Sequence, residues 1–255
     1  MGQKDRMKIV GMIPARMGSS RFPGKPLAML RGRPMIEHVA LRTALSHSLA
    51  EVYVATCDDE IAEVVTAFGG RAVMTSDRHE RASDRIAEAI THIDADIVVM
   101  IQGDEPMVHP GMIDESVAPM LVDSSIPCVN LTAPIETEEE FLSPNSIKVV
   151  MKGNGDALYM SREPIPTRFK NDFKSLPAWK QVCIMPFRRD ALFHFTQLSP
   201  TPLEIAESID MNRFLEHGVP VRMVRTLFTS QAVDTPQDLA LVERLMADDP
   251  LAGRY

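Results

Sequence analysis

Short apolar runs alternate with helix-like stretches over the first hundred residues, and this alternation constrains the fold more than any other feature. The candidate strands are residues 8–12, 51–56, 71–75 and 97–101. The candidate helices are residues 34–48, 58–68 and 82–92, the first of which carries apolar side chains at helical spacing. Residues 97–101, IVVMI, are apolar throughout, as is typical of a central strand covered on both faces. This order predicts an α/β fold with a doubly wound, mostly parallel sheet.

The character of the chain changes from about residue 128. Further strands are predicted at residues 128–135, 147–151, 157–160, 181–187 and 219–224. GNGD at 153–156 is a turn signal, and residues 162–178 should be irregular. Helices are predicted at residues 203–217, ending at Gly218, and at residues 235–246, beginning with Pro236. We therefore expect one domain over residues 1–255, with about 128–187 inserted as an antiparallel region that also supplies a dimer surface.

Composition narrows the class of protein. The 255 residues hold 27 basic and 35 acidic side chains, and the formal net charge of -8 argues against a nucleic-acid-binding surface. Three cysteines without metal-ligand spacing favour a reduced, cytoplasmic protein. No apolar run approaches the roughly 18 residues of a membrane span, so we expect no membrane partner. Residues 1–6 resemble a disordered leader.

The loop after the first strand, residues 13–27 with the sequence IPARMGSSRFPGKPL, combines glycines, hydroxyls and cations. Glycines let backbone N–H groups approach a ligand, and Arg16, Arg21 and Lys25 could neutralise a polyphosphate at the carboxyl end of the strand. An ordinary surface loop is the alternative, because neither the P-loop spacing nor GxGxxG is present. A helix should begin near Pro34, since proline suits a first helical position.

Two aspartates are candidates for a metal site. Asp104 lies in QGDEP, directly after the apolar strand, and so at the strand end where ligands of open α/β sheets gather. Asp234 lies in VDTP before the last helix. Two carboxylates suit Mg²⁺, which completes its shell with phosphate and water. The alternatives are a simple turn at Asp104 and an N-cap at Asp234.

Ser83 and Arg85 stand at the start of a predicted helix. Ser83 could cap that helix, with Asp84 favouring its positive end. In the functional interpretation, Ser83 donates to a base or ribose and Arg85 faces the cleft. The spacing alone leaves both interpretations open.

Several motifs occur in one order along the chain: PAR…GKPL from residue 14, GRPMI at 32–36, MTS at 74–76, QGDEP at 102–106, NSIKVV at 145–150, ALYMSREPIP at 157–166, SPTPLE at 199–204 and VDTPQDL at 233–239. From about residue 7 to residue 245 this order resembles the CMP-Kdo synthetase family, the 3-deoxy-manno-octulosonate (Kdo) cytidylyltransferases. QGDEP together with ALYxSR distinguishes this motif order from that of the sialic-acid cytidylyltransferases.

The resemblance implies a Rossmann-like nucleotidyltransferase fold, a homodimer, CTP as a substrate, Mg²⁺ as the cofactor and a sugar acid as the acceptor, in lipopolysaccharide biosynthesis. Arg16, Ser19 and Lys25 would hold the CTP phosphates, and Asp104 and Asp234 would hold Mg²⁺. The remaining implied nucleotide-binding residues are Pro14, Ala15, Arg21, Ser83, Arg85 and Gln102. Arg16, Lys25 and Asp104 would carry catalysis.

The acceptor side departs from the family pattern. The residues implied to bind the acceptor are Gln102, Gln181, Met185, Glu207 and Asp210. The family's SGTER stands as RASDR at 81–85, HLGIYGY as QVCIMPF at 181–187, and EMLEQLR as ESIDMNR at 207–213. A site built to hydrogen-bond a hydroxyl discriminates strongly among substrates. A different modified sugar acid, another nucleotide base and a non-catalytic nucleotide-binding homologue therefore stay open as alternatives.

Overall fold

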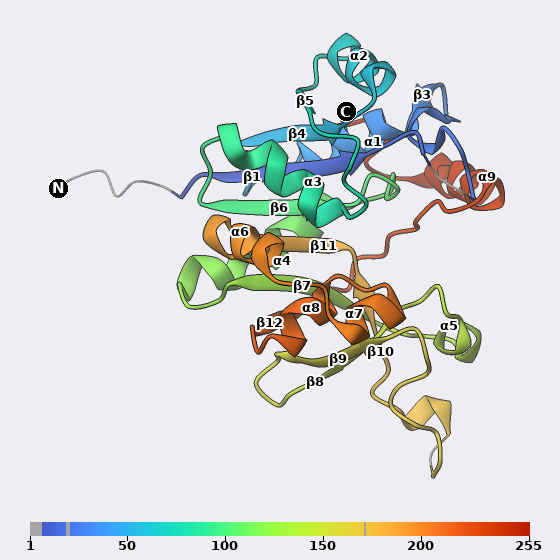
Figure 1. The fold of residues 1–255 in the computed structure, drawn as a ribbon. Helices are drawn as coiled ribbons and strands as arrows, with labels where there is room; N and C mark the ends of the chain where they lie inside the picture. The colour runs from blue at the N-terminus through green and yellow to red at the C-terminus, as the bar shows by residue number, and fades with distance from the viewer. Residues whose placement is uncertain (1–6, 19–20, 171) are drawn as a thin grey trace. The chain divides into compact units, whose positions relative to one another are not determined.

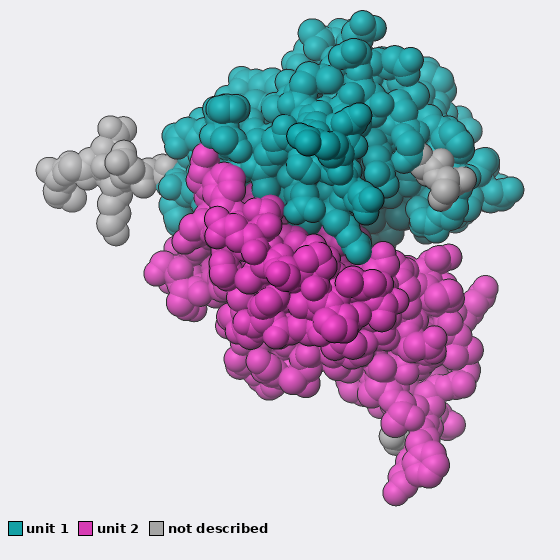
Figure 2. Space-filling model, in the orientation of Figure 1, with its two compact units in different colours: residues 1–114, 228–255 teal, residues 115–227 magenta. Residues whose placement is uncertain are grey.

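The computed structural model describes residues 7–18, 21–170 and 172–255. The chain forms two compact units (Figure 2). Unit 1 comprises residues 1–114 and 228–255, and unit 2 comprises residues 115–227. The predicted leader at residues 1–6 and the predicted phosphate-binding Ser19 lie outside the described residues. No helix in the described ranges has the length and apolar character that crossing a membrane requires.

Unit 1 is built on a parallel sheet in the order β5-β4-β1-β6 (Figure 1). Its strands are β1 (Ile9–Ala15), β4 (Glu51–Thr56), β5 (Ala72–Met74) and β6 (Ile97–Ile101). Every residue of β1 and β6 is buried. Their continuous apolar sequences follow from this burial, because a parallel strand covered on both faces has no solvent side for polar residues.

Helices and a small hairpin complete unit 1. They are η1 (Lys25–Leu27), β2 (Met29–Leu30), β3 (Arg33–Pro34), α1 (Met35–Thr43), α2 (Asp59–Ala67), α3 (Ala82–Ala89), η2 (Ile90–His92), α9 (Pro236–Leu245) and η4 (Met246–Asp248). A further helix, α4 (Pro110–Val122), runs across the boundary between the units. Helices thus follow β1, β4, β5 and β6 in turn, and the predicted mostly parallel α/β sheet is confirmed.

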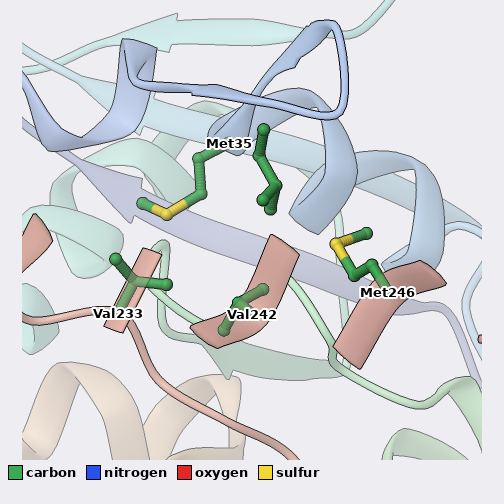
Figure 3. Packing of buried hydrophobic residues seen from close by; sticks show 5 residues of the cluster. Met35, Val233, Val242 and Met246 are labelled. Atoms are coloured by element: carbon green, nitrogen blue, oxygen red, sulfur yellow. The ribbon is translucent and has the colours of Figure 1, made fainter. Parts of the chain in front are cut away.

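A hydrophobic cluster anchors the C-terminal segment within unit 1 (Figure 3). Its fully or almost fully buried members are Leu30, Met35, Val233, Val242 and Met246. Full burial of one such side chain stabilises the fold by about 1.5–3 kcal/mol. Val233 therefore holds the segment in front of α9 against the start of α1, which fixes the position of the residue that follows it, Asp234.

Unit 2 has a mixed sheet centred on β7. Its strands are β7 (Cys128–Pro134), β8 (Lys148–Met151), β9 (Ala157–Ser161), β10 (Trp179–Val182), β11 (Ile184–Arg188) and β12 (Val221–Arg225). β12 pairs with β7 in parallel, whereas β10 and β11 pair with it antiparallel, and β8 joins β10 to β9. Its helices are α5 (Glu138–Leu142), η3 (Phe173–Ser175), α6 (Arg189–Gln197), α7 (Pro202–Glu207) and α8 (Met211–Glu216). The region 128–187, expected as an insertion, lies within this unit.

The strand predicted at residues 181–187 is wrong as a single element. The structure has two strands, β10 and β11, which break at Cys183. Val182 pairs with Leu131 and Phe187 pairs with Cys128, so the chain advances five residues while β7 advances three. The break at Cys183 accommodates the extra residues of this segment.

The single helix predicted at residues 203–217 is also wrong. It breaks into α7 and α8 at Ser208, whose φ of 53° is left-handed. The break lets Glu204 of α7 accept from Arg213 of α8 at 2.6 and 2.7 Å, both buried. Residues nine apart on a continuous helix lie about 13.5 Å apart along its axis, so the pair requires the break. Gly218, with φ of 76°, ends α8 as predicted.

Candidate functional site

A pocket of about 450 Å³ opens in unit 1 at the carboxyl ends of β1 and β6. Five cationic side chains and three carboxylates line it, although the chain as a whole is acidic. The cations are Arg16, Arg21, Lys25, Arg81 and Arg85, and the carboxylates are Glu80, Asp104 and Asp234. This local excess of positive charge suits an anionic ligand.

The loop after β1 forms one wall of the pocket. Pro14 and Ala15 end the strand, and Arg16 and Gly18 follow on the pocket wall. The Gly24 N–H donates to the Met17 carbonyl at 3.1 Å, which closes the loop on itself. Gly24 has a φ of 72°, a backbone conformation that favours glycine. Lys25 then opens η1 and points its ammonium group at the carboxylates of Asp104 and Asp234.

Two backbone features bring Asp104 and Asp234 together. A Cβ on Gly103 would stand 2.7 Å from the carbonyl oxygen of Pro14, so only glycine lets the segment after β6 pass the end of β1 this closely. The Val233 N–H donates to the Asp104 carbonyl at 2.9 Å. The two aspartates therefore belong to chain segments joined by a direct backbone hydrogen bond.

Both carboxylates pair with cations, and Lys25 contacts both of them. Lys25 Nζ lies 2.8 Å from Asp104 Oδ2 and 3.5 Å from Asp234 Oδ1. Arg21 donates to the same Asp234 oxygen at 2.9 Å. The Lys25 side chain is 14% exposed, and those of Asp104 and Asp234 are 29% and 34% exposed, so the group remains open to solvent. The arrangement places two carboxylates and two cations at one wall of the pocket.

The possible role of Asp234 as an N-cap is wrong. Thr235 is the N-cap of α9, and its hydroxyl accepts from the Asp238 N–H at 3.2 Å. Asp238 returns the interaction by accepting from the Thr235 N–H at 2.8 Å. This reciprocal capping box satisfies the helix start without the Asp234 carboxylate, which is directed to Arg21 and Lys25 instead.

The possible role of Ser83 as a helix cap is also wrong. α3 has Arg81 as its N-cap, and Ser83 is a fully buried residue of the helix that does not appear among the pocket-lining residues. Arg85 does line the pocket, and it donates to Thr75 Oγ1 at 2.6 Å and to the Ser76 carbonyl at 3.4 Å. Arg85 therefore also holds the segment that connects β5 to α3.

That connecting segment supplies pocket residues that were not predicted from the sequence, namely His79, Glu80 and Arg81. The Ser76 N–H donates to the Glu88 carboxylate at 3.0 Å, and this bond lowers the pKa of Glu88. The imidazole of His79 contacts the same carboxylate. The charged run RHERASDR at 78–85 is the signal that could have drawn attention to this wall.

Gln102 lines the pocket in unit 1, whereas the other four residues implied to bind the acceptor belong to unit 2. Gln181 donates to Asn130 Oδ1 at 2.6 Å and contacts the sulfur of Met185 at 3.8 Å. Met185 is itself buried. Asp210 precedes α8, and its carbonyl accepts from the Arg213 N–H at 3.1 Å.

Glu207 is the centre of a hydrogen-bond network at the end of α7. Its carboxylate accepts from the hydroxyls of Tyr159 and Ser161, each at 2.7 Å, and from the Arg162 N–H at 2.8 Å. Burial alone would raise the pKa of Glu207, but these three donors lower it overall. The ALYMSR motif at 157–162 and the end of α7 are thus held together by one ionised carboxylate.

A parallel α/β sheet with a cation-rich pocket at its carboxyl edge belongs to the class of folds that bind ligands at that edge, nucleotides among them. The sequence profile of the cytidylyltransferase family matches residues 10–227. A 3-deoxy-manno-octulosonate cytidylyltransferase from Geobacter metallireducens is 50% identical over 249 residues, which cover 94% of this chain and 98% of the relative. A second from Geotalea uraniireducens is 49% identical over 94% of this chain and 99% of the relative.

A solved structure agrees with these relatives. CMP:2-keto-3-deoxy-manno-octonic acid synthetase, solved in complex with CTP, is 40% identical and superimposes with a TM-score of 0.89 over 94% of this chain and 98% of that chain. The chain therefore belongs to the cytidylyltransferase family, among the 3-deoxy-manno-octulosonate cytidylyltransferases. The family resemblance inferred from the sequence motifs is confirmed.

Proposed function

We propose that the protein transfers CMP from CTP to the anomeric hydroxyl of Kdo and releases pyrophosphate. The observation that carries this proposal is the pairing of Asp104 and Asp234 beside Lys25, in a pocket lined by five cations. Paired carboxylates next to an anion-binding loop are what transfer from a nucleoside triphosphate requires. The family to which the chain belongs supports CTP as the donor and Kdo as the acceptor.

The loop after β1 is proposed to bind the triphosphate. Arg16, Arg21 and Lys25 supply the charge, and Pro14 and Ala15 supply the strand end on which the loop turns. Ser19, outside the described residues, is a further proposed phosphate ligand. Arg85 and Gln102, which also line the pocket, are proposed to contribute to the nucleotide site. Ser83, which is fully buried in α3, is also proposed to contribute.

Asp104 and Asp234 are proposed to hold Mg²⁺. Carboxylate oxygens are the protein ligands that Mg²⁺ prefers, and it commonly takes only one or two of them alongside substrate phosphates. Among the described residues no group of three or more His, Cys, Asp or Glu side chains gathers as a metal site. Two carboxylates beside the loop proposed to bind phosphates match this preference of Mg²⁺. When bound, Mg²⁺ supplies charge that polarises the phosphoryl group and favours ionisation of an acceptor hydroxyl.

The chemical step is an in-line displacement. The acceptor hydroxyl gives up its proton to solvent and its oxygen forms a bond to the α-phosphorus of CTP. The bond from that phosphorus to the bridging oxygen breaks, and pyrophosphate carries away the electron pair. No protein nucleophile is needed, so positioning and charge neutralisation supply the catalysis. Arg16 and Lys25 are proposed to stabilise the charge that develops on the leaving pyrophosphate.

Gln102 is proposed as an acceptor-binding residue of unit 1. Within unit 2, the residues proposed to bind the acceptor are Gln181, Met185, Glu207 and Asp210. Of these, Glu207 has the best-defined surroundings, because its three donors keep its carboxylate ionised and oriented. We also propose a cytoplasmic homodimer. Cys57, Cys128 and Cys183 are reduced thiols, which supports a reducing compartment, and the family resemblance supports the dimer.

Pyrophosphate release tests the proposed function. The purified protein is assayed with Mg²⁺ and each of the four nucleoside triphosphates, with Kdo and with a panel of other sugar acids. Release that requires both CTP and Kdo is the expected result. Pyrophosphate release with another sugar acid and not with Kdo would show that the acceptor is that sugar acid. Release with another nucleotide would show that the donor is not CTP alone. No release with any combination would contradict the proposed function.

A further inference from the structure

Asp58 lies at the N-cap of α2 but does not cap it. An aspartate at this position ordinarily accepts from the amides of the first helical turn, which stabilises the helix. The Asp58 carboxylate makes no such bond, although the structure describes every residue of that turn. Its Oδ2 atom instead accepts from the N–H of Met17, 41 residues earlier, at 2.8 Å. The Cys57 thiol also contacts this oxygen at 3.6 Å, so the side chain serves the loop after β1 and its own neighbour rather than the first turn of α2.

The contact holds the middle of the basic loop. The Met17 carbonyl already accepts from the Gly24 N–H at 3.1 Å. With Asp58 on its N–H, Met17 has both of its backbone polar groups fixed. Its neighbours Arg16 and Gly18 line the pocket. The orientation of this residue therefore sets the direction in which the loop leaves the strand and turns around the pocket.

Asp58 is itself held firmly. Its N–H donates to the hydroxyl of Thr56 at 3.1 Å, and Thr56 is fully buried. Thr56 is the last residue of β4 and pairs in register with Ala15, the last residue of β1. These contacts fix the Asp58 carboxylate relative to the carboxyl end of β1, from which the loop departs.

We infer that Asp58 is a positioning residue that presets the loop for the triphosphate of the nucleotide. This inference rests on the proposed function of the loop. A carboxylate next to an anion-binding loop opposes anion binding by its charge, so any benefit it gives must come from the geometry of the Met17 hydrogen bond. The charge effect and the geometric effect therefore have opposite signs and can be separated by substitution.

Two substitutions separate the charge effect from the geometric effect, with CTP and CMP binding measured by isothermal titration calorimetry. Asp58→Ala removes the hydrogen bond and should weaken CTP binding about tenfold, in line with the value of a hydrogen bond to a charged group. Asp58→Asn keeps an acceptor for the Met17 N–H without the charge, and should bind CTP within about threefold of the wild-type protein. CMP, which lacks the outer phosphates, should lose less than about threefold in Asp58→Ala.

Asp58→Ser keeps the test decisive if the alanine variant fails to fold. Serine is a good N-cap and can stabilise α2, but its hydroxyl is one bond nearer the backbone and falls short of Met17. It should melt no lower than the wild-type protein and still lose about tenfold in CTP affinity. The matched control is Asp59→Ala, at the exposed neighbouring position, which should leave CTP binding unchanged.

The outcomes are distinguishable. Serine and alanine variants that bind CTP within about twofold of the wild-type protein, or more tightly, would overturn the positioning role. Equal losses for CMP and CTP would overturn it as well, because they would indicate a general loosening of the pocket. Failure of the wild-type protein to bind CTP would instead contradict the proposed function.

Discussion

Asp104→Asn removes one charge from the carboxylate pair while keeping the shape of the side chain. Lys25 Nζ lies 2.8 Å from Asp104 Oδ2, and a pair at this distance attracts by about 1.5 kcal/mol at the dielectric constant of water. Because both side chains are partly exposed, the measurable contribution is about 0–1 kcal/mol. In the variant, Lys25 still contacts Asp234, and the hydrogen bond from the Val233 N–H to the Asp104 carbonyl does not involve the Asp104 side chain. We expect the melting temperature to fall by no more than about 4 °C.

Turnover should respond far more strongly. If Asp104 holds the metal ion, its neutralisation removes about 3–4 kcal/mol of transition-state stabilisation, which is a loss of roughly two to three orders of magnitude in kcat. Pyrophosphate release at saturating CTP and Kdo measures the loss, and a thermal melt of the same sample reports the fold. Asp94→Asn is the matched control, because Asp94 is exposed and precedes β6 at its opposite end.

Two results would refute this reasoning. Near-normal turnover in Asp104→Asn would show that the carboxylate is not a metal ligand. A drop of more than about 10 °C in the melting temperature would show that the pair with Lys25 is chiefly structural, since exposed pairs do not contribute that much.

Three further predictions concern charge and capping. Lys25→Met should weaken CTP binding at least about tenfold. It should also tighten Mn²⁺ binding in the absence of nucleotide, because Lys25 neutralises both proposed metal ligands. Unchanged Mn²⁺ affinity in a calorimetric titration would contradict this prediction. Thr235→Ala should lower the free energy of unfolding in urea by about 1 kcal/mol, and Asp234→Ala by less, whereas the reverse order would contradict the cap assignment. The hydrogen bond from Lys8 is the largest of the contacts that lower the pKa of Glu51 from 4.5 to about 2. The ionised Glu51 carboxylate therefore stabilises the folded protein above pH 4.5, and this stabilisation is lost as the pH falls towards 2. Glu51→Gln should flatten that part of the plot of melting temperature against pH. A variant plot parallel to that of the wild-type protein would contradict the prediction.

The parallel sheet could be predicted because strand burial determines local sequence. β4 and β6 begin and end at the predicted residues, 51–56 and 97–101. β6 is buried on both faces and is therefore apolar throughout, a signal that needs no knowledge of its partner strands. Gly218 and Pro236 marked a helix end and a helix start for equally local reasons.

The errors arose where distant contacts override local preference. The break at Ser208 is stabilised by the buried pair of Glu204 and Arg213, which no periodicity reveals. α4 was not predicted, and it contains Pro119, a residue that normally argues against a helix interior. α5 and α6 were not predicted either.

The candidate site likewise combines residues that the sequence reveals with contacts that it does not reveal. Asp104 and Asp234 could be chosen from the sequence because each follows or precedes a recognisable element. The backbone bond between Val233 and the Asp104 carbonyl, which brings them together, joins residues that are far apart in the sequence. The contact from Asp58 to Met17 is equally invisible, because an aspartate before a helix predicts a cap.

The transfer of CMP itself is the central claim, and ³¹P nuclear magnetic resonance of a reaction mixture tests it most directly. With CTP, Mg²⁺ and Kdo, we expect the three phosphate signals of CTP to be replaced by one phosphodiester signal and one pyrophosphate signal, with one pyrophosphate formed per phosphodiester. Formation of CDP and inorganic phosphate, or an unchanged CTP spectrum alongside demonstrated CTP binding, would contradict the account.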